Sequence, residues 1–430
     1  MRKVLFIVAF LCLTWVVPAQ AITCTATISP GTNLIAAAFN VRSPGDTLCL
    51  AVGSYPATAT QFLTASGTAG NPITLTCADG VAADCTLSAT TNTSGLDPLL
   101  IGANYVTVEN LTITGGDWGL LVTGSKTLHY HHVTVSNVVA SNAACAGISM
   151  VGGDYFNMNH CILFNNGKTA TQSCSGATVY EPQATDTISG THIYFGYNIA
   201  YLNGNPSGGT DGEGFSFDDF SCGQGNYCTT SPNQYTQQAV AEENISFLNQ
   251  GPGFTVGYDN AGANITVRDS AYWWNNTKLL NSGITTRGEM TAVQVTTGVK
   301  MYNSNEWANQ TQYTSDISSP FVCSGCTAGY VHSNNLASLT TSGGTTSNPL
   351  YTTAPTCTST SCSNTGNWNI ASASPARGIG TTSYGLPPSD FAGNAFNAPP
   401  DSGAYQFVGA TPAPTPIPAG ISGGPNSNWW

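Results

Sequence analysis

Four carboxylates lie within nine residues of a chain that is otherwise poor in charge. Asp211, Glu213, Asp218 and Asp219 flank the apolar segment 214–217, although only 7% of all residues are Asp, Glu, Lys or Arg. Carboxylates held this close repel one another, and a bound cation relieves that repulsion. Because many hard oxygen ligands in one place suit Ca²⁺, the sequence predicts a calcium site here.

A repeat in the sequence brings a fifth carboxylate to the same place. When the glycines that begin a series of similar segments are aligned, Glu181 falls level with Asp219 of the next repeat unit. Tyr180 falls level with Asp218 in the same alignment. Adjacent strands of a sheet are ~4.8 Å apart, so Glu181 is expected to join the calcium ligands.

The elements that must position these residues are short strands. Alternating polar and apolar residues predict strands, and an Asn at a fixed phase predicts a tight left-handed turn whose side chains stack as a ladder. The alternating segments begin at Asn110, His132, His160, Asn198, Asn244 and Ser270, and five residues later stand Gly115, Asn137, Asn165, Asn203, Asn249 and Asn275. A second series of strands begins at Gly119, Gly147, Gly176, Gly214 and Gly253.

Each repeat unit holds three short strands, and the spacing of the units varies from 22 residues (110 to 132) to 46 residues (198 to 244). One unit cannot bury its apolar faces alone, whereas stacked units bury a continuous core. The sequence therefore predicts an all-β protein, a parallel β-helix with three strands in each coil. A β-sandwich of hairpins is the alternative, but it needs frequent Asn-Gly or Asp-Gly turns, and the chain has few.

The ends of the chain differ from the repeat. Residues 1–21 are predicted to be a signal peptide, because two basic residues precede an apolar stretch and an Ala-Gln-Ala site. The β-helix with its N-terminal cap is predicted at 22–335, where the helix-like segment 33–41 forms the cap. An irregular C-terminal closing module is expected at 336–407, and a Pro-rich disordered tail at 408–430.

The cysteines after the signal peptide form close pairs in the sequence. An exported protein meets an oxidising compartment, so these pairs are expected to be disulfides, and Cys161 is left over as a buried free thiol. The pairs are Cys24 with Cys49, Cys77 with Cys85, Cys145 with Cys174, Cys222 with Cys228, Cys323 with Cys326, and Cys357 with Cys362. The histidines are expected to be structural, with His132 and His160 as members of the Asn column.

The charge balance limits the partners. Without Arg2 and Lys3, 8 basic residues face 22 acidic ones, which gives a net charge of 8 − 22 = −14. Such a surface repels phosphate backbones, so nucleic acid is not an expected partner. No later segment has about 20 consecutive apolar residues, so no membrane span is expected. The mature protein is expected to be secreted and monomeric.

Segments near both ends carry a resemblance to a known family. Residues 43–55 (SPGDTLCLAVGSY) and 66–75 (SGTAGNPITL), with 375–378 (PARG), 390–394 (DFAGN) and 400–405 (PDSGAY), are similar to segments of secreted β-helix proteins of the polysaccharide-lyase type. This pectate-lyase-like superfamily has right-handed parallel β-helices, often closed by a C-terminal module. Together with the repeats, the resemblance covers most of the mature chain, and it implies a polysaccharide as substrate or ligand.

The resemblance also implies a reaction. In such lyases Ca²⁺ binds the uronate carboxylate and acidifies the neighbouring proton, which a Lys or Arg removes. Asp211, Glu213, Asp218 and Asp219 are then the ligand candidates, together with the aligned Glu181. Lys278 and Arg287, from a later loop, are the candidates for the base.

Other interpretations of the carboxylates stay open. A glycoside hydrolase would need two carboxylates about 5–9.5 Å apart, for which Asp218 with Asp211 or Glu181 is the candidate pair. The same residues are also expected of a structural cation site or of capped turns, since Asp is a common turn former. A sugar-binding subsite without chemistry, on a non-catalytic surface or adhesive β-helix, is the remaining alternative.

Overall fold

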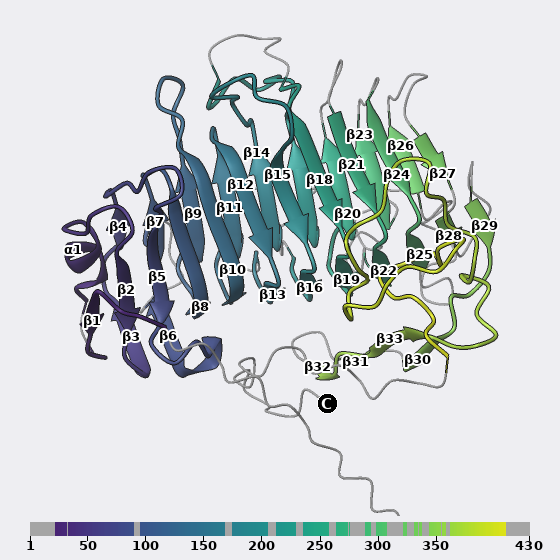
Figure 1. Cartoon of the computed structure of the whole chain (residues 1–430), viewed down its shortest axis with the longest axis horizontal. Coiled ribbons are helices and arrows are strands. Elements are labelled where there is room, and N and C mark those ends of the chain that lie inside the picture. The colour runs from purple at the N-terminus through teal and green to yellow at the C-terminus, as the bar shows by residue number, and fades with distance from the viewer. Residues whose placement is uncertain are drawn as a thin grey trace, which may run out of the picture.

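The computed structural model describes residues 22–31, 33–89, 95–167, 174–204, 212–228, 235–257, 264–273, 275, 289–293, 298–307, 321–324, 331–333, 335–337, 344–353, 355–357 and 362–409. Nearly all of its regular elements are β-strands, and most of them pair in parallel with the strand of the next coil. The prediction of an all-β, right-handed parallel β-helix is confirmed. Figure 1 shows the coils stacked along the long axis of the molecule.

Three rows of strands run along the helix, and we call them faces 1, 2 and 3. Face 1 holds β1 (Ala26–Ile28), β2 (Thr47–Leu50), β5 (Ile73–Cys77), β8 (Val106–Thr114), β10 (His131–Ser141), β12 (Asp154–Asn159), β15 (Thr191–Gly196), β18 (Gln238–Glu242), β21 (Asn264–Arg268), β24 (Val299–Tyr302) and β27 (Val331–Ser333). Face 2 holds β3 (Gly53–Ala57), β6 (Cys85–Ala89), β13 (Ile162–Phe164), β16 (Ile199–Tyr201), β19 (Ile245–Phe247), β22 (Ala271–Trp273), β25 (Asn305–Trp307), β28 (Asn335–Ala337) and β29 (Gly344–Thr346).

Face 3 is a separate nine-stranded sheet. It holds β4 (Phe62–Leu63), β7 (Leu99–Ile101), β9 (Leu120–Thr123), β11 (Ile148–Val151), β14 (Ala177–Tyr180), β17 (Phe215–Asp218), β20 (Phe254–Gly257), β23 (Met290–Val293) and β26 (Phe321–Ser324). Strands β8 and β10 are long enough to run from face 1 into face 2.

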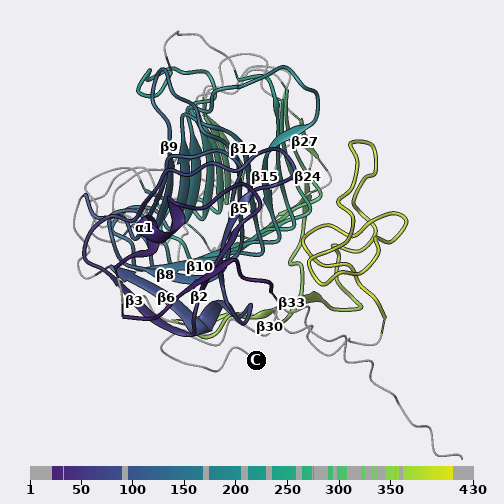
Figure 2. The same cartoon turned by 60° about the vertical axis from the view of Figure 1, so that its left-hand side comes forward.

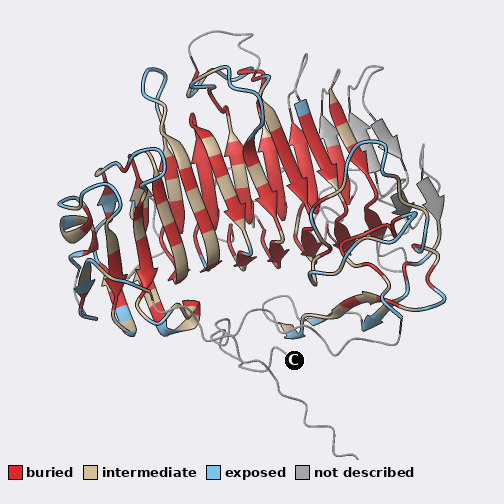
Figure 3. Ribbon diagram, viewed as in Figure 1, coloured by how far each residue is buried: buried red, intermediate tan, exposed pale blue. Residues whose placement is uncertain are grey.

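The core fills the inside of the coils. Along β12, buried Phe156 and Met158 alternate with half-buried Tyr155 and Asn157, as the period of two in a strand requires. The inward side chains of all three faces form one continuous apolar cluster, and Figure 3 shows the buried residues along the strands. The outward side chains are not part of this core and can form binding or reaction sites.

An Asn ladder fixes the bend after face 2. The backbone N–H groups of Asn166, Asn203 and Asn249 each donate to the Oδ1 of the ladder residue one coil later, at 3.1, 2.9 and 3.2 Å. The last member, Asn275, donates its own N–H to the buried carboxylate of Glu289 at 3.0 Å. The expected ladder is confirmed for Asn203, Asn249 and Asn275, while Asn166 rather than Asn165 is its first Asn.

The predicted alignment of the first coils is wrong. His132 lies level with Tyr105 and Tyr155, not with Asn110. Asn137 lies level with Asn110 instead, and its Nδ2 donates to Asn110 Oδ1 at 2.7 Å. Strands β8 and β10 pass through the bend without a break. The alignment by the first residue of each alternating segment therefore placed the residues of these coils at the wrong level.

A column of left-handed residues marks the bend between faces 1 and 2. A positive φ is uncommon for residues other than glycine, and Asn adopts it most readily. The column consists of Asn110, Asn137, His160, Tyr197, Glu243, Asp269 and Asn303, with φ between 48° and 59°. His160 therefore lies level with Asn110, as predicted, whereas Asn198 and Asn244 lie one position later than this column. Glu243 and Asp269 stand in the column because of the way the coils pack.

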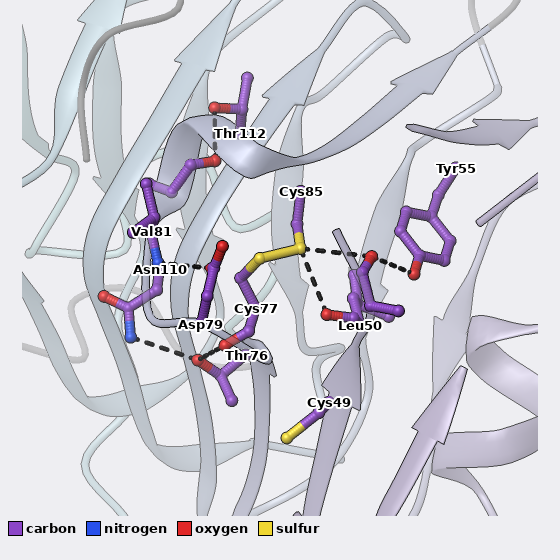
Figure 4. Close-up of a disulfide and its surroundings, with 12 residues drawn as sticks. Cys49, Leu50, Tyr55, Thr76, Cys77, Asp79, Val81, Cys85, Asn110 and Thr112 are labelled. Atoms are coloured by element: carbon purple, nitrogen blue, oxygen red, sulfur yellow. Dashed lines mark hydrogen bonds between the residues drawn. A yellow bond between two sulfur atoms is a disulfide. The ribbon is translucent and has the colours of Figure 1, made fainter. Parts of the chain in front are cut away.

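Five of the six predicted disulfides are confirmed: Cys24–Cys49, Cys77–Cys85, Cys145–Cys174, Cys222–Cys228 and Cys357–Cys362. Figure 4 shows the second of these, which joins the end of β5 to the start of β6. In the same region, Asn110 Nδ2 donates to Thr76 Oγ1 at 3.2 Å. Cys161 is free and buried, as predicted, whereas Cys326 lies outside the described residues.

The N-terminal end of the helix is covered, and the strands after the last coil pack against its side. The predicted N-terminal cap is a short helix, α1 (Ile35–Phe39), which buries Ile35 and Phe39 at the first coil, where Figure 2 shows it. The antiparallel pairs β30 (Tyr351–Thr353) with β33 (Asn367–Ile370), and β31 (Thr356–Cys357) with β32 (Cys362–Asn364), follow the last coil. The Trp368 ring packs 5.3 Å from Phe247 on face 2.

The chain after β33 returns to face 1. Tyr197 Oη donates to the carbonyl of Ser389 at 3.0 Å, and Tyr302 Oη donates to that of Tyr384 at 3.0 Å. This segment therefore stands on the outside of face 1, where it borders the site described below. No helix in the described ranges has the length and hydrophobicity that crossing a membrane requires.

Candidate functional site

The predicted carboxylate edge lies at the end of β14 and β17 on face 3. Tyr180 and Asp218 occupy level positions on these two strands, as the alignment of glycines predicted. Asp218 is half-buried and lies beside Gly257 of β20, where a Cβ would approach its Oδ1 to 2.6 Å. The glycine therefore gives the carboxylate its room.

Two of the predicted ligands bind the backbone of a loop. The Asp219 carboxylate accepts the N–H groups of Gly223 and Gln224 at 2.5 and 2.6 Å. The Glu181 carboxylate accepts two further N–H groups of the same loop, one of them from Asn226 at 3.0 Å. Both acidic residues are buried and hold positive φ angles of 50° and 45°. They fix a loop that the Cys222–Cys228 disulfide closes.

The pKa of Asp219 reflects both its burial and these bonds. Burial raises the pKa of Asp219, its bonds to the amides of Gly223 and Gln224 lower it, and the neighbouring Glu181 carboxylate raises it again. The net effect is a raised pKa, because the desolvation of the charged form dominates. Among the alternatives left open by the sequence, the capped turn describes Glu181 and Asp219 best.

The other predicted residues are spread more widely. Glu213 is buried, and its two oxygens accept the hydroxyls of Ser175 and Thr255 at 2.8 and 3.4 Å, which links three coils. Asp211, Lys278 and Arg287 lie outside the described residues. Within the described ranges, no three or more His, Cys, Asp or Glu side chains are arranged to hold a metal ion. The calcium site stays a prediction.

A cleft of about 670 Å³ on face 1 is the feature that sequence reasoning missed. Its floor includes one row of side chains, Thr107, Thr134, Asn157 and Tyr194, which lie level on β8, β10, β12 and β15. The loop before β5 lines one wall, and the C-terminal segment at Pro388 lines the other. The alternation of residues in these strands predicts which side chains point outward. The walls of the cleft come from distant segments, which the sequence does not place.

A column of stacked rings borders this row. Tyr105, His132, Tyr155 and His192 occupy level positions in successive coils, and their ring centroids lie 4.5, 4.0 and 3.8 Å apart in turn. Burial and the neighbouring His131 lower the pKa of His132. The His132 imidazole is therefore neutral at pH 7. Its place in this column of rings corrects the expectation that it replaces an Asn of the ladder.

Asp154 anchors the far end of this column. The buried Asp154 carboxylate lies 3.0 Å from His192 Nδ1 and accepts the Tyr235 hydroxyl at 2.5 Å and the Thr185 N–H at 2.7 Å. The Tyr155 hydroxyl donates to Asp186 at 2.9 Å, and burial followed by this contact raises the pKa of Tyr155. The groups beside the cleft are thus fixed in place.

The comparisons with known proteins concern the fold. No protein-family model and no curated protein matches the chain. The crystal structure of pectate lyase Pel9A matches with a TM-score of 0.56 and 16% identity, over 90% of this chain and 97% of that chain. An alginate lyase from Paenibacillus sp. str. FPU-7 (TM-score 0.36, 17% identity, 72% and 99% covered) and a rhamnogalacturonan lyase (0.37, 13%, 68% and 80%) are further matches. The chain has the pectate-lyase-like parallel β-helix fold.

Proposed function

We propose that this protein is an exported polysaccharide lyase whose reaction centre is the outer edge of β14, β17 and β20. The observation that carries the proposal is the placement of Asp218 level with Tyr180 at that edge, in a fold shared with pectate lyase Pel9A over 90% of the chain. Five disulfides support export, because such bonds persist in oxidising compartments.

The roles in this proposal follow β-elimination on a uronate. A base must remove the proton next to the uronate carboxylate, and Lys278 or Arg287 is proposed for this task. A desolvated Lys with a lowered pKa can act as such a base at neutral pH. The loop held by Glu181 and Asp219 stands beside the edge, so these two residues are proposed to shape the site rather than to react.

The described carboxylates limit which residues could bind calcium in this proposal. The described carboxylates do not form a calcium site by themselves, because Glu181 and Asp219 bind loop amides and Glu213 binds two hydroxyls. A site at this edge would need Asp218 together with Asp211. No step of the reaction is therefore assigned to the ion.

A glycoside hydrolase is the second candidate. Hydrolysis needs one protonated and one ionised carboxylate near the scissile bond. The half-buried Asp218 at this edge is the candidate for one of them, and Asp211 is the candidate for the other. A hydrolase produces new reducing ends without a double bond, so the products separate the two candidates.

The test is an activity screen of the purified protein on polygalacturonate, alginate and neutral polysaccharides, with and without EDTA. A lyase produces unsaturated ends that absorb ultraviolet light, and the variant Asp218→Asn is expected to lose that activity. The variant Asp46→Asn, at a turn far along the chain from this edge, serves as the control. If no polysaccharide is cleaved, the proposal fails and a non-catalytic binding protein takes its place.

A further inference from the structure

We propose that the cleft on face 1 binds an uncharged stretch of polysaccharide, at a site separate from the reaction edge on face 3. The proposal takes the class of ligand, a polysaccharide, from the proposed function. Its geometry is independent of that function, because Tyr194 belongs to β15 whereas Asp218 belongs to β17 of the other sheet.

Tyr194 forms a flat platform on the floor of the cleft. Its ring lies along the strand over Gly196, where any Cβ would collide with it. Its hydroxyl donates to Glu242 Oε1 at 2.9 Å, so the ring is held both from below and at its tip. An aromatic ring fixed in this way offers a large apolar face at little entropic cost, and the C–H face of a sugar ring packs on such a surface.

The rest of the floor supplies hydrogen bonds in a regular row. Thr107, Thr134 and Asn157 continue the level of Tyr194 over three neighbouring strands. In the described part of the chain, the hydroxyls of Thr107 and Thr134 have no hydrogen-bond partner. From Thr107 on β8 to Glu242 on β18 the cleft crosses four strand spacings, about 19 Å at ~4.8 Å each. A long, open row of this kind fits a linear chain of sugars better than a small ligand.

The charges favour an uncharged ligand. None of the residues that line the cleft is Lys or Arg. Glu242, its one acidic residue, is paired with Arg268 Nη2 at 2.6 Å. His132 is neutral at pH 7, since burial lowers its pKa. No unpaired cation is therefore present in this lining to receive a uronate carboxylate.

Two groups beside the cleft, His192 and Tyr155, are held by other protein groups rather than free for chemistry. His192 uses both ring nitrogens, with Nδ1 3.0 Å from Asp154 and Nε2 2.8 Å from the carbonyl of Ile188. The Tyr155 hydroxyl is engaged by Asp186. A general acid or base needs a proton site that faces the substrate, and these two residues offer none.

The experiment is affinity electrophoresis in gels that contain a soluble β-1,4-glucan, a xylan, a galactomannan or polygalacturonate. Wild-type protein is expected to be retarded by at least one neutral polysaccharide. Tyr194→Ala is expected to weaken that binding at least about tenfold, as the loss of an aromatic anchor does. Thr134→Val, which removes one hydroxyl and keeps the shape, is expected to weaken it about two- to tenfold.

The control is Phe62→Ala, which removes a partly exposed ring from β4 on face 3 and should leave the binding unchanged. Retardation by a neutral polysaccharide that Tyr194→Ala and Thr134→Val both weaken supports the proposal. Absence of binding to all neutral polysaccharides, or binding that neither variant changes, overturns it. Lyase activity that survives in Tyr194→Ala would leave the reaction edge standing, so the two proposals can fail separately.

Discussion

The buried Glu289 at the end of the Asn ladder should make the stability of this protein fall as the pH rises. Burial raises the pKa of Glu289 from its ordinary 4.5 to about 8, against the bonds from the side chain and backbone of Asn275, which lower it. The folded state therefore favours the neutral acid. Its contribution is fully present below pH 4.5 and is lost as the pH rises towards 8.

The variant Glu289→Gln removes this dependence and keeps the contacts. Gln has nearly the same shape, and its amide oxygen can accept both the N–H and the Nδ2–H of Asn275, as the carboxylate does. One pKa unit corresponds to about 1.4 kcal/mol, so a rise from 4.5 to about 8 corresponds to at most about 5 kcal/mol. The free energy of unfolding of the variant should exceed that of wild type by a growing amount between pH 5 and pH 8.

Urea unfolding at pH 5, 6.5 and 8 measures this difference. Other buried carboxylates contribute equally to both proteins, so the difference between the two curves isolates Glu289. Asn71→Ala, an exposed substitution that involves no titratable group, should keep the pH slope of wild type. If Glu289→Gln shows the same pH slope as wild type, the raised pKa is refuted, and with it the neutral end of the ladder.

Further predictions concern the ladder, the buried acids, the free thiol and the metal. Asn249→Ala leaves the Asn203 N–H without its acceptor and should lower the free energy of unfolding by about 1–3 kcal/mol. The exposed Asn71→Ala should not, and equal effects of the two variants in unfolding experiments would contradict the ladder. The carboxylate oxygens of Glu243 are buried without a hydrogen-bond partner in the described structure, and burial raises the pKa of this residue. Glu243→Gln should therefore raise the melting temperature at pH 8 more than at pH 5, and an equal change at both pH values would contradict the raised pKa. Burial raises the pKa of Cys161 to about 12, so iodoacetamide should not modify the native protein but should modify the unfolded one, as mass spectrometry can show. If the predicted calcium site exists, EDTA should lower the melting temperature and Ca²⁺ should restore it; an unchanged melting temperature would remove calcium from the proposal.

Local patterns in the sequence determined the coil architecture. Alternation and recurrent Asn depend on residues a few positions apart, so the strands, the ladder from Asn203 to Asn275 and the position of α1 could be predicted. Five disulfides followed from closeness in the sequence, since short loops bring their two ends together. The glycine alignment also gave the level of Tyr180 with Asp218.

Only the tertiary structure decided what the outward side chains do. Glu181 and Asp219 look like metal ligands when they are read as charges, but the fold of the following loop turns its N–H groups towards them. The register of His132 depended on whether β10 breaks at the bend, which its own residues do not reveal. The cleft on face 1 needs walls from the loop before β5 and from the segment at Pro388, more than 300 residues apart in the chain. Contacts over such distances depend on how the coils stack. The sequence repeat predicts the order of the coils, but not which residues of neighbouring strands lie level.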